Sequence, residues 1–94
     1  MPIDPEVHAP TRLQLMTMLS AVNEAEFATL RDHLDVSDSV LSKHLSALSA
    51  IGYVRTRKAT HRGKRTTWIK ITGTGRNALQ SHVSALRALI DGVA

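Results

Sequence analysis

Apolar residues recur at helical spacing along the first third of the chain. They predict a helix over residues 9–22, where Pro10 suits the first helical turn, and a shorter helix over residues 27–35. A brief extended piece can precede the second helix, because the polar break Asn23-Glu24 separates the two periodic stretches. The amino-terminal third is therefore expected to be helical.

A third helix is predicted directly after the second. The hydroxyl of Ser37 can accept the free amide protons of a first helical turn, and Gly52 suits the left-handed residue that follows a helix. We therefore expect this helix to end near Ile51. Only a few residues join it to the second helix, so the two must pack at a steep angle that leaves one face projecting. The residues that point outward are Ser39, Ser42, Lys43, Ser46 and Ala50.

The hydrophobic period changes to two after the third helix. Residues 53–58 and 66–72 are predicted to be strands, joined by a loop over residues 59–65. A last helix follows, capped by Thr72 or Thr74, with apolar residues at near-heptad spacing. At 1.5 Å per residue it would run roughly 30 Å, which is long for so small a chain.

This order of elements predicts a mainly α fold of the α+β class. Three helices, a two-stranded hairpin and a long C-terminal helix form the order of a winged helix-turn-helix. The chain has 94 residues, 43% hydrophobic and 21% charged, which suits one domain over residues 1–94 with residues 1–8 as an N-terminal arm. Because so small a core is marginal for a monomer, we expect a homodimer with residues 73–92 as the dimerisation helix.

Charge is divided unequally between the two halves of the chain. Residues 1–50 carry three basic and seven acidic side chains, whereas residues 51–94 carry nine basic side chains and one acidic one. The formal net charge of +4 therefore hides a strongly basic second half. Such a separation suggests a surface that faces a polyanion, although a solvated basic loop would produce it equally well.

The predicted hairpin holds most of this positive charge. Residues 55–70 contain seven Lys or Arg side chains and no acidic one. Next to a helix-turn-helix pattern, we interpret them as phosphate contacts. Arg62 and Arg65, near the tip, are candidates for a minor-groove or backbone contact. The full set of candidate wing residues is Arg55, Arg57, Lys58, Arg62, Lys64, Arg65 and Lys70.

The outward face of the third helix suits the major groove of a DNA duplex. Its small hydroxyl side chains allow close approach to base edges, and Lys43 can reach a guanine or a phosphate. Asp38 can accept a hydrogen bond from a cytosine amino group or interact with the helix dipole, and we favour the dipole. The candidate DNA-binding residues of this helix are Ser37, Asp38, Ser39, Ser42, Lys43, His44 and Ser46.

Three segments resemble the bacterial and archaeal MarR/ArsR-like winged helix-turn-helix transcriptional regulators. They are Val36 to Leu48, Gly52-Tyr53-Val54, and Ile71-Thr72-Gly73-Thr74-Gly75-Arg76, and the resemblance covers nearly the whole chain. It implies that the third helix is the recognition helix, the basic hairpin is the wing, and the terminal helices form a dimer interface. We expect that interface to use Leu15, Met18, Leu79, Val83, Leu86, Ile90 and Val93.

These observations lead us to expect a sequence-specific regulator of transcription that binds double-stranded DNA and represses. The recognition helix would enter the major groove, and the wing would contact the backbone or the minor groove. The alternatives are a winged-helix protein-interaction module and a non-specific nucleic-acid-binding protein. The basic hairpin and the polar third helix favour DNA. Whether a small-molecule effector binds stays open.

Other chemistry has little support in the residue pattern. The chain has no cysteine, which excludes disulfides and thiolate metal sites and sets it apart from cysteine-dependent members of the families it resembles. The five histidines lack metal-ligand spacing, and no nucleophile with its base is recognisable, so we expect no metal, no cofactor and no enzyme. The absence of a long apolar run and the acidic, proline-broken start lead us to expect a cytoplasmic protein with no membrane partner.

Overall fold

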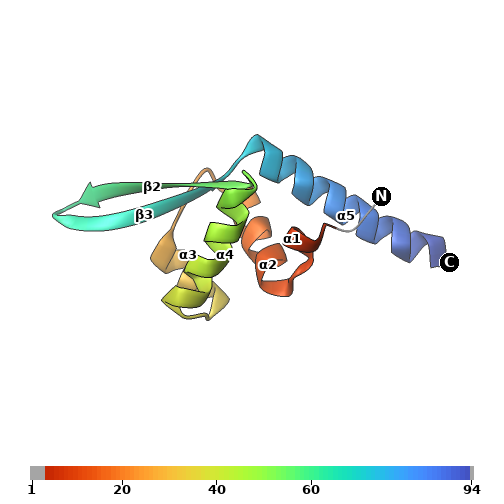
Figure 1. The fold of residues 1–94 in the computed structure, drawn as a ribbon, viewed down its shortest axis with the longest axis horizontal. Helices are drawn as coiled ribbons and strands as arrows, with labels where there is room; N and C mark the ends of the chain where they lie inside the picture. The colour runs from red at the N-terminus through yellow and green to blue at the C-terminus, as the bar shows by residue number, and fades with distance from the viewer. Residues whose placement is uncertain (1–3, 94) are drawn as a thin grey trace.

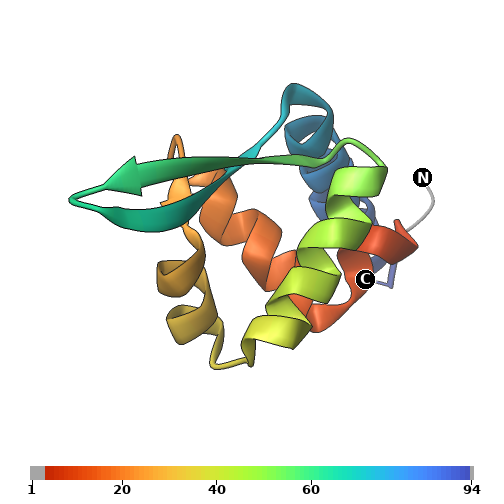
Figure 2. The same ribbon diagram turned by 60° about the vertical axis from the view of Figure 1, so that its left-hand side comes forward.

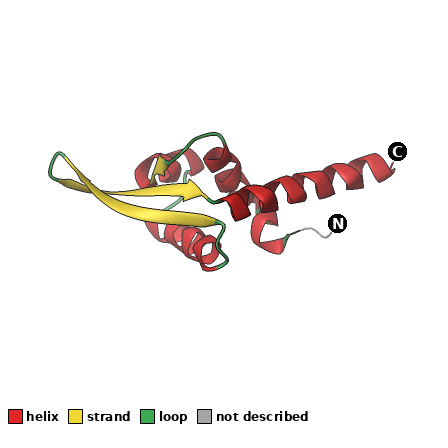
Figure 3. Cartoon of the chain, turned by 90° about the horizontal axis from the view of Figure 1, so that it is seen from above, coloured by secondary structure: helices red, strands yellow, loops and turns green. Residues whose placement is uncertain are grey.

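The computed structural model describes the backbone of residues 4–93 and the side chains of residues 4–92. Over this range the chain forms five helices and an antiparallel sheet with the strand order β1-β3-β2. The hairpin of β2 and β3 and the last helix extend to opposite sides of a helical body (Figures 1 and 3). The elements are α1 (Pro5–His8), α2 (Pro10–Ser20), β1 (Ala25–Glu26), α3 (Phe27–Leu34), α4 (Asp38–Ala50), β2 (Val54–His61), β3 (Lys64–Ile71) and α5 (Gly73–Val93).

The core lies where α2, α3 and α4 meet the base of the sheet (Figure 2). Leucines on the inner faces of the three helices pack against Ile69 in the central strand, β3. In α4 the buried residues are Leu41, Leu45 and Leu48, about one per turn, which gives this helix the apolar stripe that its sequence predicts. The arrangement confirms the predicted winged helix of the α+β class.

The helix boundaries follow the sequence closely, with one shortening. Helices α3 and α4 begin and end within a residue of the predicted limits, whereas α2 ends at Ser20 rather than at residue 22. The brief extended piece before the second helix is β1, whose Ala25 and Glu26 pair with Ile69 and Trp68 of β3. Strand β1 thus joins the helical body to the hairpin.

The hairpin has longer strands and a shorter connection than the sequence predicts. Each strand has eight residues, and the turn consists of Arg62 and Gly63, with φ angles of 51° and 77°. Two central residues with positive φ are typical of a type I′ turn, whose twist matches that of the paired strands. The loop predicted over residues 59–65 is therefore wrong at both ends. An arginine at positive φ is strained, and its side chain gives no local signal for this turn.

Helix α5 begins at a tight junction with the sheet. The Thr72 hydroxyl accepts a hydrogen bond from the Gly75 amide at 2.9 Å and donates one to the Gly52 carbonyl at 2.6 Å. Gly75 lies so close to the residue before β2 that a Cβ there would collide with the Tyr53 carbonyl oxygen. By contrast, Gly73, two residues earlier, has open space where its Cβ would stand.

The N-terminal arm predicted over residues 1–8 is corrected over the residues that the structure describes. Residues 5–8 form α1, with Pro5 in its first turn and the Asp4 carboxylate accepting from the Glu6 amide at 2.9 Å. Val7 is fully buried in the core. An apolar side chain in so short a segment shows no period, so the sequence pattern could not reveal this helix.

Helix α1 contacts both the end of α4 and the middle of α5. The second oxygen of Asp4 accepts a hydrogen bond from the Tyr53 hydroxyl at 2.6 Å, just beyond α4. The ring of His8 lies against His82 of α5, with 5.4 Å between ring centroids, and His82 is only 1% exposed. The N-terminal segment therefore packs as part of the domain.

Two residues expected at a dimer interface belong instead to the core of the protomer. Leu15 is fully buried and Leu79 is 8% exposed, so neither is available to a partner. A seam at heptad spacing does not reveal whether its own domain or another chain covers it. Among the described side chains, the large apolar residues exposed on α5 are Val83, Leu89 and Ile90, at 38%, 59% and 71%. Met18 and Leu86 are partly buried, and the Val93 side chain lies outside the described residues.

None of the helices in residues 4–93 combines the length and the apolar character needed to cross a membrane.

Candidate nucleic-acid interface

Helices α3 and α4 form a helix-turn-helix with a tight connection. Asp35 ends α3 in the left-handed region, with a φ of 53°. Two residues later the Ser37 hydroxyl accepts a hydrogen bond from the Val40 amide at 3.2 Å, which caps α4 as the sequence predicts. Because the chain reverses within three residues, α4 projects one face away from the core.

The projecting face of α4 carries the polar residues that the helical period assigns to it. Ser39, Ser42, Lys43 and Ser46 are all exposed, while Leu41, Leu45 and Leu48 face inward. Val40, next to Ser39, is also 41% exposed, and the small hydroxyl side chains beside it leave room for a base edge to approach the backbone closely.

Asp38, in the first turn of α4, is held by a residue that the sequence analysis did not single out. One of its carboxylate oxygens accepts from Nη1 of Arg31 at 2.9 Å, and Nε of Arg31 donates to Asp32 at 3.0 Å. These two carboxylates, Asp38 first, raise the pKa of the Arg31 guanidinium. A pair that links α3 to the start of α4 agrees with a structural role for Asp38, which also suits the helix dipole.

His44 has a defined structural contact on the inner edge of α4. Its Nδ1 accepts a hydrogen bond from Nε of Arg12 at 3.0 Å, and Arg12 also pairs with Glu6 of α1. Burial, and then the charges of Arg12 and Lys43, lower the pKa of His44, so the neutral ring that can accept this bond is favoured. Among residues 4–93, no three or more His, Asp and Glu side chains are grouped to hold a metal ion.

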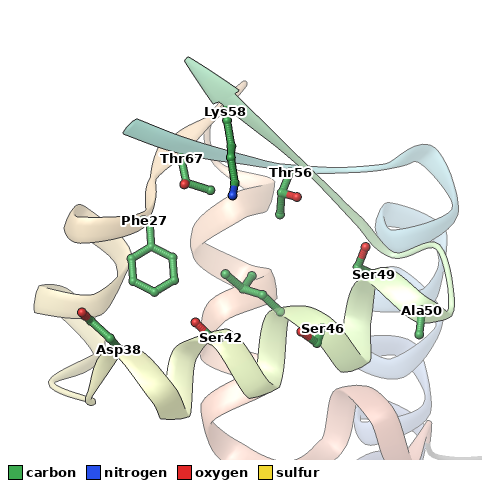
Figure 4. A pocket seen from close by; sticks show the side chains of 10 residues that line it. Phe27, Asp38, Ser42, Ser46, Ser49, Ala50, Thr56, Lys58 and Thr67 are labelled. Carbon is green, nitrogen blue, oxygen red and sulfur yellow. The ribbon is translucent and has the colours of Figure 1, made fainter. Parts of the chain in front are cut away.

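A groove runs between α4 and the hairpin (Figure 4). Hydroxyl groups line both walls, and Lys58 extends from the hairpin toward α4. Such a groove has hydrogen-bond donors on each wall, which suits the phosphate backbone of one nucleic-acid strand. The lining residues are Phe27, Asp38, Ser42, Leu45, Ser46, Ser49, Ala50, Thr56, Lys58 and Thr67.

The strand register divides the wing cations between the two faces of the sheet. Residues directly opposite each other in an antiparallel pair share a face, and the side chains alternate along each strand. Lys58 pairs with Thr67 and Arg65 pairs with Thr60, which gives these two cations the face of Thr56 and the groove. We call this face the groove side. Arg62 lies in the turn between the strands.

The other face of the sheet, the far side, carries the remaining predicted wing residues. By register these are Arg55, Arg57, Lys64 and Lys70, together with Trp68. The seven candidate wing residues therefore do not share one face of the hairpin, and their contacts with a duplex stay a prediction. A count of basic residues along a hairpin cannot distinguish the two faces when both strands are polar throughout.

Arg57 differs further from the expectation because its charge is already paired. Its Nε and Nη2 donate to the two oxygens of Glu24, both at 2.7 Å, and its guanidinium carbon lies 5.7 Å from the centre of the Trp68 ring. The hydrogen bond from Arg57 is the main cause that lowers the pKa of Glu24. Sequence analysis missed Glu24, because 33 residues separate it from Arg57 and no local pattern joins them.

Helix α4 follows a tight turn after α3 and exposes a polar face, and a cationic hairpin lies beside it. This arrangement defines the winged helix-turn-helix class. Residues 11–90 match the family model described as a winged helix DNA-binding domain, and the chain belongs to this family. It is 33% identical to the uncharacterized protein MJ0432 of Methanocaldococcus jannaschii over 72 residues, which are 77% of this chain and 78% of that protein.

Solved structures show the same fold. A transcriptional regulator homologue from Pyrococcus horikoshii superposes with a TM-score of 0.88 at 30% identity, over 94% of this chain and 87% of that one. HlyU from Vibrio cholerae gives a TM-score of 0.66 at 28% identity, over 80% and 77% of the two chains. A zinc-responsive MarR family member and an ArsR family regulator share the fold alone, at 16% and 21% identity.

Proposed function

We propose that this protein is a homodimeric regulator that binds specific sites in double-stranded DNA and represses transcription by blocking a promoter. The observation that supports it most strongly is the groove between α4 and the hairpin, which has hydroxyl groups on both walls and the cation Lys58 on the hairpin wall. A surface of this kind suits a duplex, because bases can meet the helix while phosphates meet the hairpin. The protein then acts by binding and not by catalysis.

Each cation near the groove has a separate role in the proposed complex. Lys43 contacts a guanine edge or an adjacent phosphate in the major groove. Lys58 and Arg65, on the groove side of the wing, contact phosphates, and Arg62 enters the minor groove from the turn. The strained φ of 51° at Arg62 supports this role, because asparagine or glycine would fit the turn better.

The proposed dimer forms through the last turns of α5. Leu89 and Ile90 are 59% and 71% exposed on a helix that projects beyond the domain (Figure 1), and Val83 continues the apolar face toward the body. A second copy would cover these side chains and present two recognition helices. Half-sites roughly 10 bp apart, or a multiple of that spacing, are then expected. Ile90→Asp should convert the dimer to monomer in light scattering; a dimer that survives it would contradict this interface.

The salt dependence of binding tests how many cations meet phosphates. If Lys43, Lys58, Arg62 and Arg65 each neutralise one phosphate, a dimer releases about eight counterions and the log–log slope is near −7. If Arg55 and Lys70 on the far side also contacted phosphates, the slope would approach about −11. A slope near zero would reject the wing as a phosphate-binding element.

Two matched pairs of variants test the assignment of residues. Lys43→Ala should reduce discrimination between a duplex that the protein selects from a random pool and an unselected duplex, whereas Arg62→Asn should weaken both about equally. Asparagine removes the charge and is accepted by the turn. Arg65→Ala on the groove side should cost more affinity than Arg55→Ala on the far side. Equal losses in the second pair would contradict the two-face interpretation.

The rival functions predict different outcomes in the same competition assay. A non-specific nucleic-acid-binding protein would bind selected duplex, random duplex and RNA with similar affinity. A protein-interaction module would bind none of them with a salt-dependent affinity. Selective retention of one duplex over RNA and random duplex, measured by fluorescence anisotropy, is the result that our proposal requires.

A further inference from the structure

A cluster on the far side of the wing has no part in the proposed DNA contacts. Arg57 of β2 extends over the ring of Trp68 in the central strand, β3, and ends on Glu24, directly before β1. The contact therefore spans all three strands of the sheet, β2, β3 and β1 in that order. We call Glu24, Arg57 and Trp68 the wing strut.

Val54, Ile69 and Ile71 anchor the base of the hairpin in the core, whereas the backbone pairing at the β1 edge is short. Strand β1 contributes only two residue pairs to the sheet, whereas β2 and β3 pair with each other through eight. The bidentate contact between Arg57 and Glu24 has a fixed fork geometry, because a guanidinium meets a carboxylate in one plane. Of the two side chains, Glu24 is 27% exposed and Arg57 is 55% exposed, so solvent reaches the pair.

The charge of Glu24 is unfavourable for DNA binding taken by itself. It places a carboxylate beside Arg57 and Lys70 on an otherwise cationic hairpin, and it neutralises one of the cations. Through-space electrostatics alone would therefore make DNA affinity rise when this carboxylate is removed. If Glu24 instead positions the wing, removal of its carboxylate should lower DNA affinity.

We propose that the wing strut fixes the angle of the hairpin relative to α3 and α4, and that Glu24 and Arg57 are positioning residues for DNA binding. The inference rests on the proposed function, since it concerns the geometry of the wing on a duplex. Without the strut the outer part of the hairpin bends about its buried base, and Lys58 and Arg65 must be reordered when DNA binds. The entropy of that ordering weakens the complex.

The variant Glu24→Gln tests directly whether DNA affinity falls or rises when this carboxylate loses its charge. The strut predicts binding to the selected duplex that is weaker by roughly threefold, on the order expected for one exposed ion pair. The matched control is Glu26→Gln, which removes the same charge two residues away, where the described residues show no ion pair. We expect this control to bind as tightly as the parent protein or slightly more tightly. Tighter binding by Glu24→Gln would overturn the proposal.

Arg57→Lys separates geometry from charge, because it keeps the positive charge and loses the planar fork. If the strut positions the wing, this variant weakens binding as Glu24→Gln does, and the double variant is no weaker than either single one. If Arg57 is a phosphate contact, Arg57→Lys binds normally, or its effect adds to that of Glu24→Gln. Either of these results overturns the proposal.

A measurement without DNA distinguishes failure of the strut from failure of the proposed function. Trp68 is the only tryptophan of the chain, so fluorescence excited selectively at the indole reports on the surroundings of this one ring. When Glu24→Gln frees the guanidinium from the ring, acrylamide should quench Trp68 more strongly. The control for this readout is Asp35→Asn, which removes an exposed carboxylate at the far end of α3, away from the β1–β3 pair that holds Trp68. Equal quenching in both variants refutes the strut, whatever the parent protein binds. A parent protein that binds no duplex refutes the proposed function and leaves this readout valid.

Discussion

The junction between the sheet and α5 gives a prediction that depends on one contact. In Gly75→Ala the new methyl group meets the Tyr53 carbonyl oxygen, which already accepts a hydrogen bond from the Thr72 amide at 3.0 Å, and it would lie 2.9 Å from Cγ1 of Ile71. Backbone at a strand end cannot rotate away as a flexible side chain can. We therefore expect the upper part of the overpacking range, about 2–3 kcal/mol of lost stability.

Gly73→Ala is the matched control, because both glycines lie in the first turn of α5. Its methyl group would meet nothing within 4 Å. The substitution reduces the freedom of the unfolded chain, so it should leave stability unchanged or raise it by about 0.4–1 kcal/mol. The same entropic gain offsets part of the cost at Gly75, which leaves a net loss of about 2 kcal/mol.

Urea unfolding followed by far-ultraviolet circular dichroism measures both variants. The protomer concentration must be constant, since dimer formation would contribute to the apparent stability. In thermal unfolding followed by the same signal, the unfolding temperature of Gly75→Ala should fall by roughly 8–16 °C for a chain of this size. The steric argument is refuted if the free energy of unfolding of Gly75→Ala lies within about 0.5 kcal/mol of that of the parent protein. It is also refuted if Gly73→Ala loses as much stability as Gly75→Ala.

Three further predictions concern single hydrogen bonds. Ser37→Ala should lose about 1 kcal/mol of stability in urea, because the Val40 amide loses its cap; an unchanged midpoint would contradict the capping role. The bond to Asp4, with burial, raises the pKa of Tyr53 to about 12, so stability should fall as pH rises from 10 to 12. The stability of Tyr53→Phe should not change over that pH range. Burial and the charge of Arg12 lower the pKa of His44. The neutral ring therefore contributes fully to folding stability above pH 6.5, and this contribution is lost as pH falls below that value. His44→Gln keeps an acceptor that does not titrate and should reduce that loss; an equal acid sensitivity would show that the ring contact contributes little.

The sequence predicts the helical part of the fold because its signals there are local. A cap at Ser37, buried leucines at helical spacing and Gly52 after the last turn specify α4 and the exposure of Ser39 and Lys43. Periodicity fails in the hairpin, where polar residues occupy both faces beyond its base. The two faces of the wing become distinct only once the register of β2 with β3 is known.

The missed features all depend on contacts between distant segments. Glu24 meets Arg57 across the sheet, and Asp4 meets Tyr53 across 49 residues, so neither pair has a signature at fixed spacing. The interface residues on α5 were predicted from spacing alone, which does not show that Leu79 faces the body of its own protomer. Tertiary packing decided each of these positions.

The packing of α1 has a practical consequence for the design of shortened proteins. The family match begins at residue 11, so a fragment cut at that limit would lack Val7 and the Asp4 carboxylate. The loss of Val7 would leave a cavity in the core, and the Tyr53 hydroxyl, just beyond α4, would lose its hydrogen-bond acceptor. Burial of one valine side chain contributes about 1.5–3 kcal/mol, a large share of the stability of so small a domain. A stable fragment must therefore begin no later than Asp4, ahead of the boundary that homology suggests.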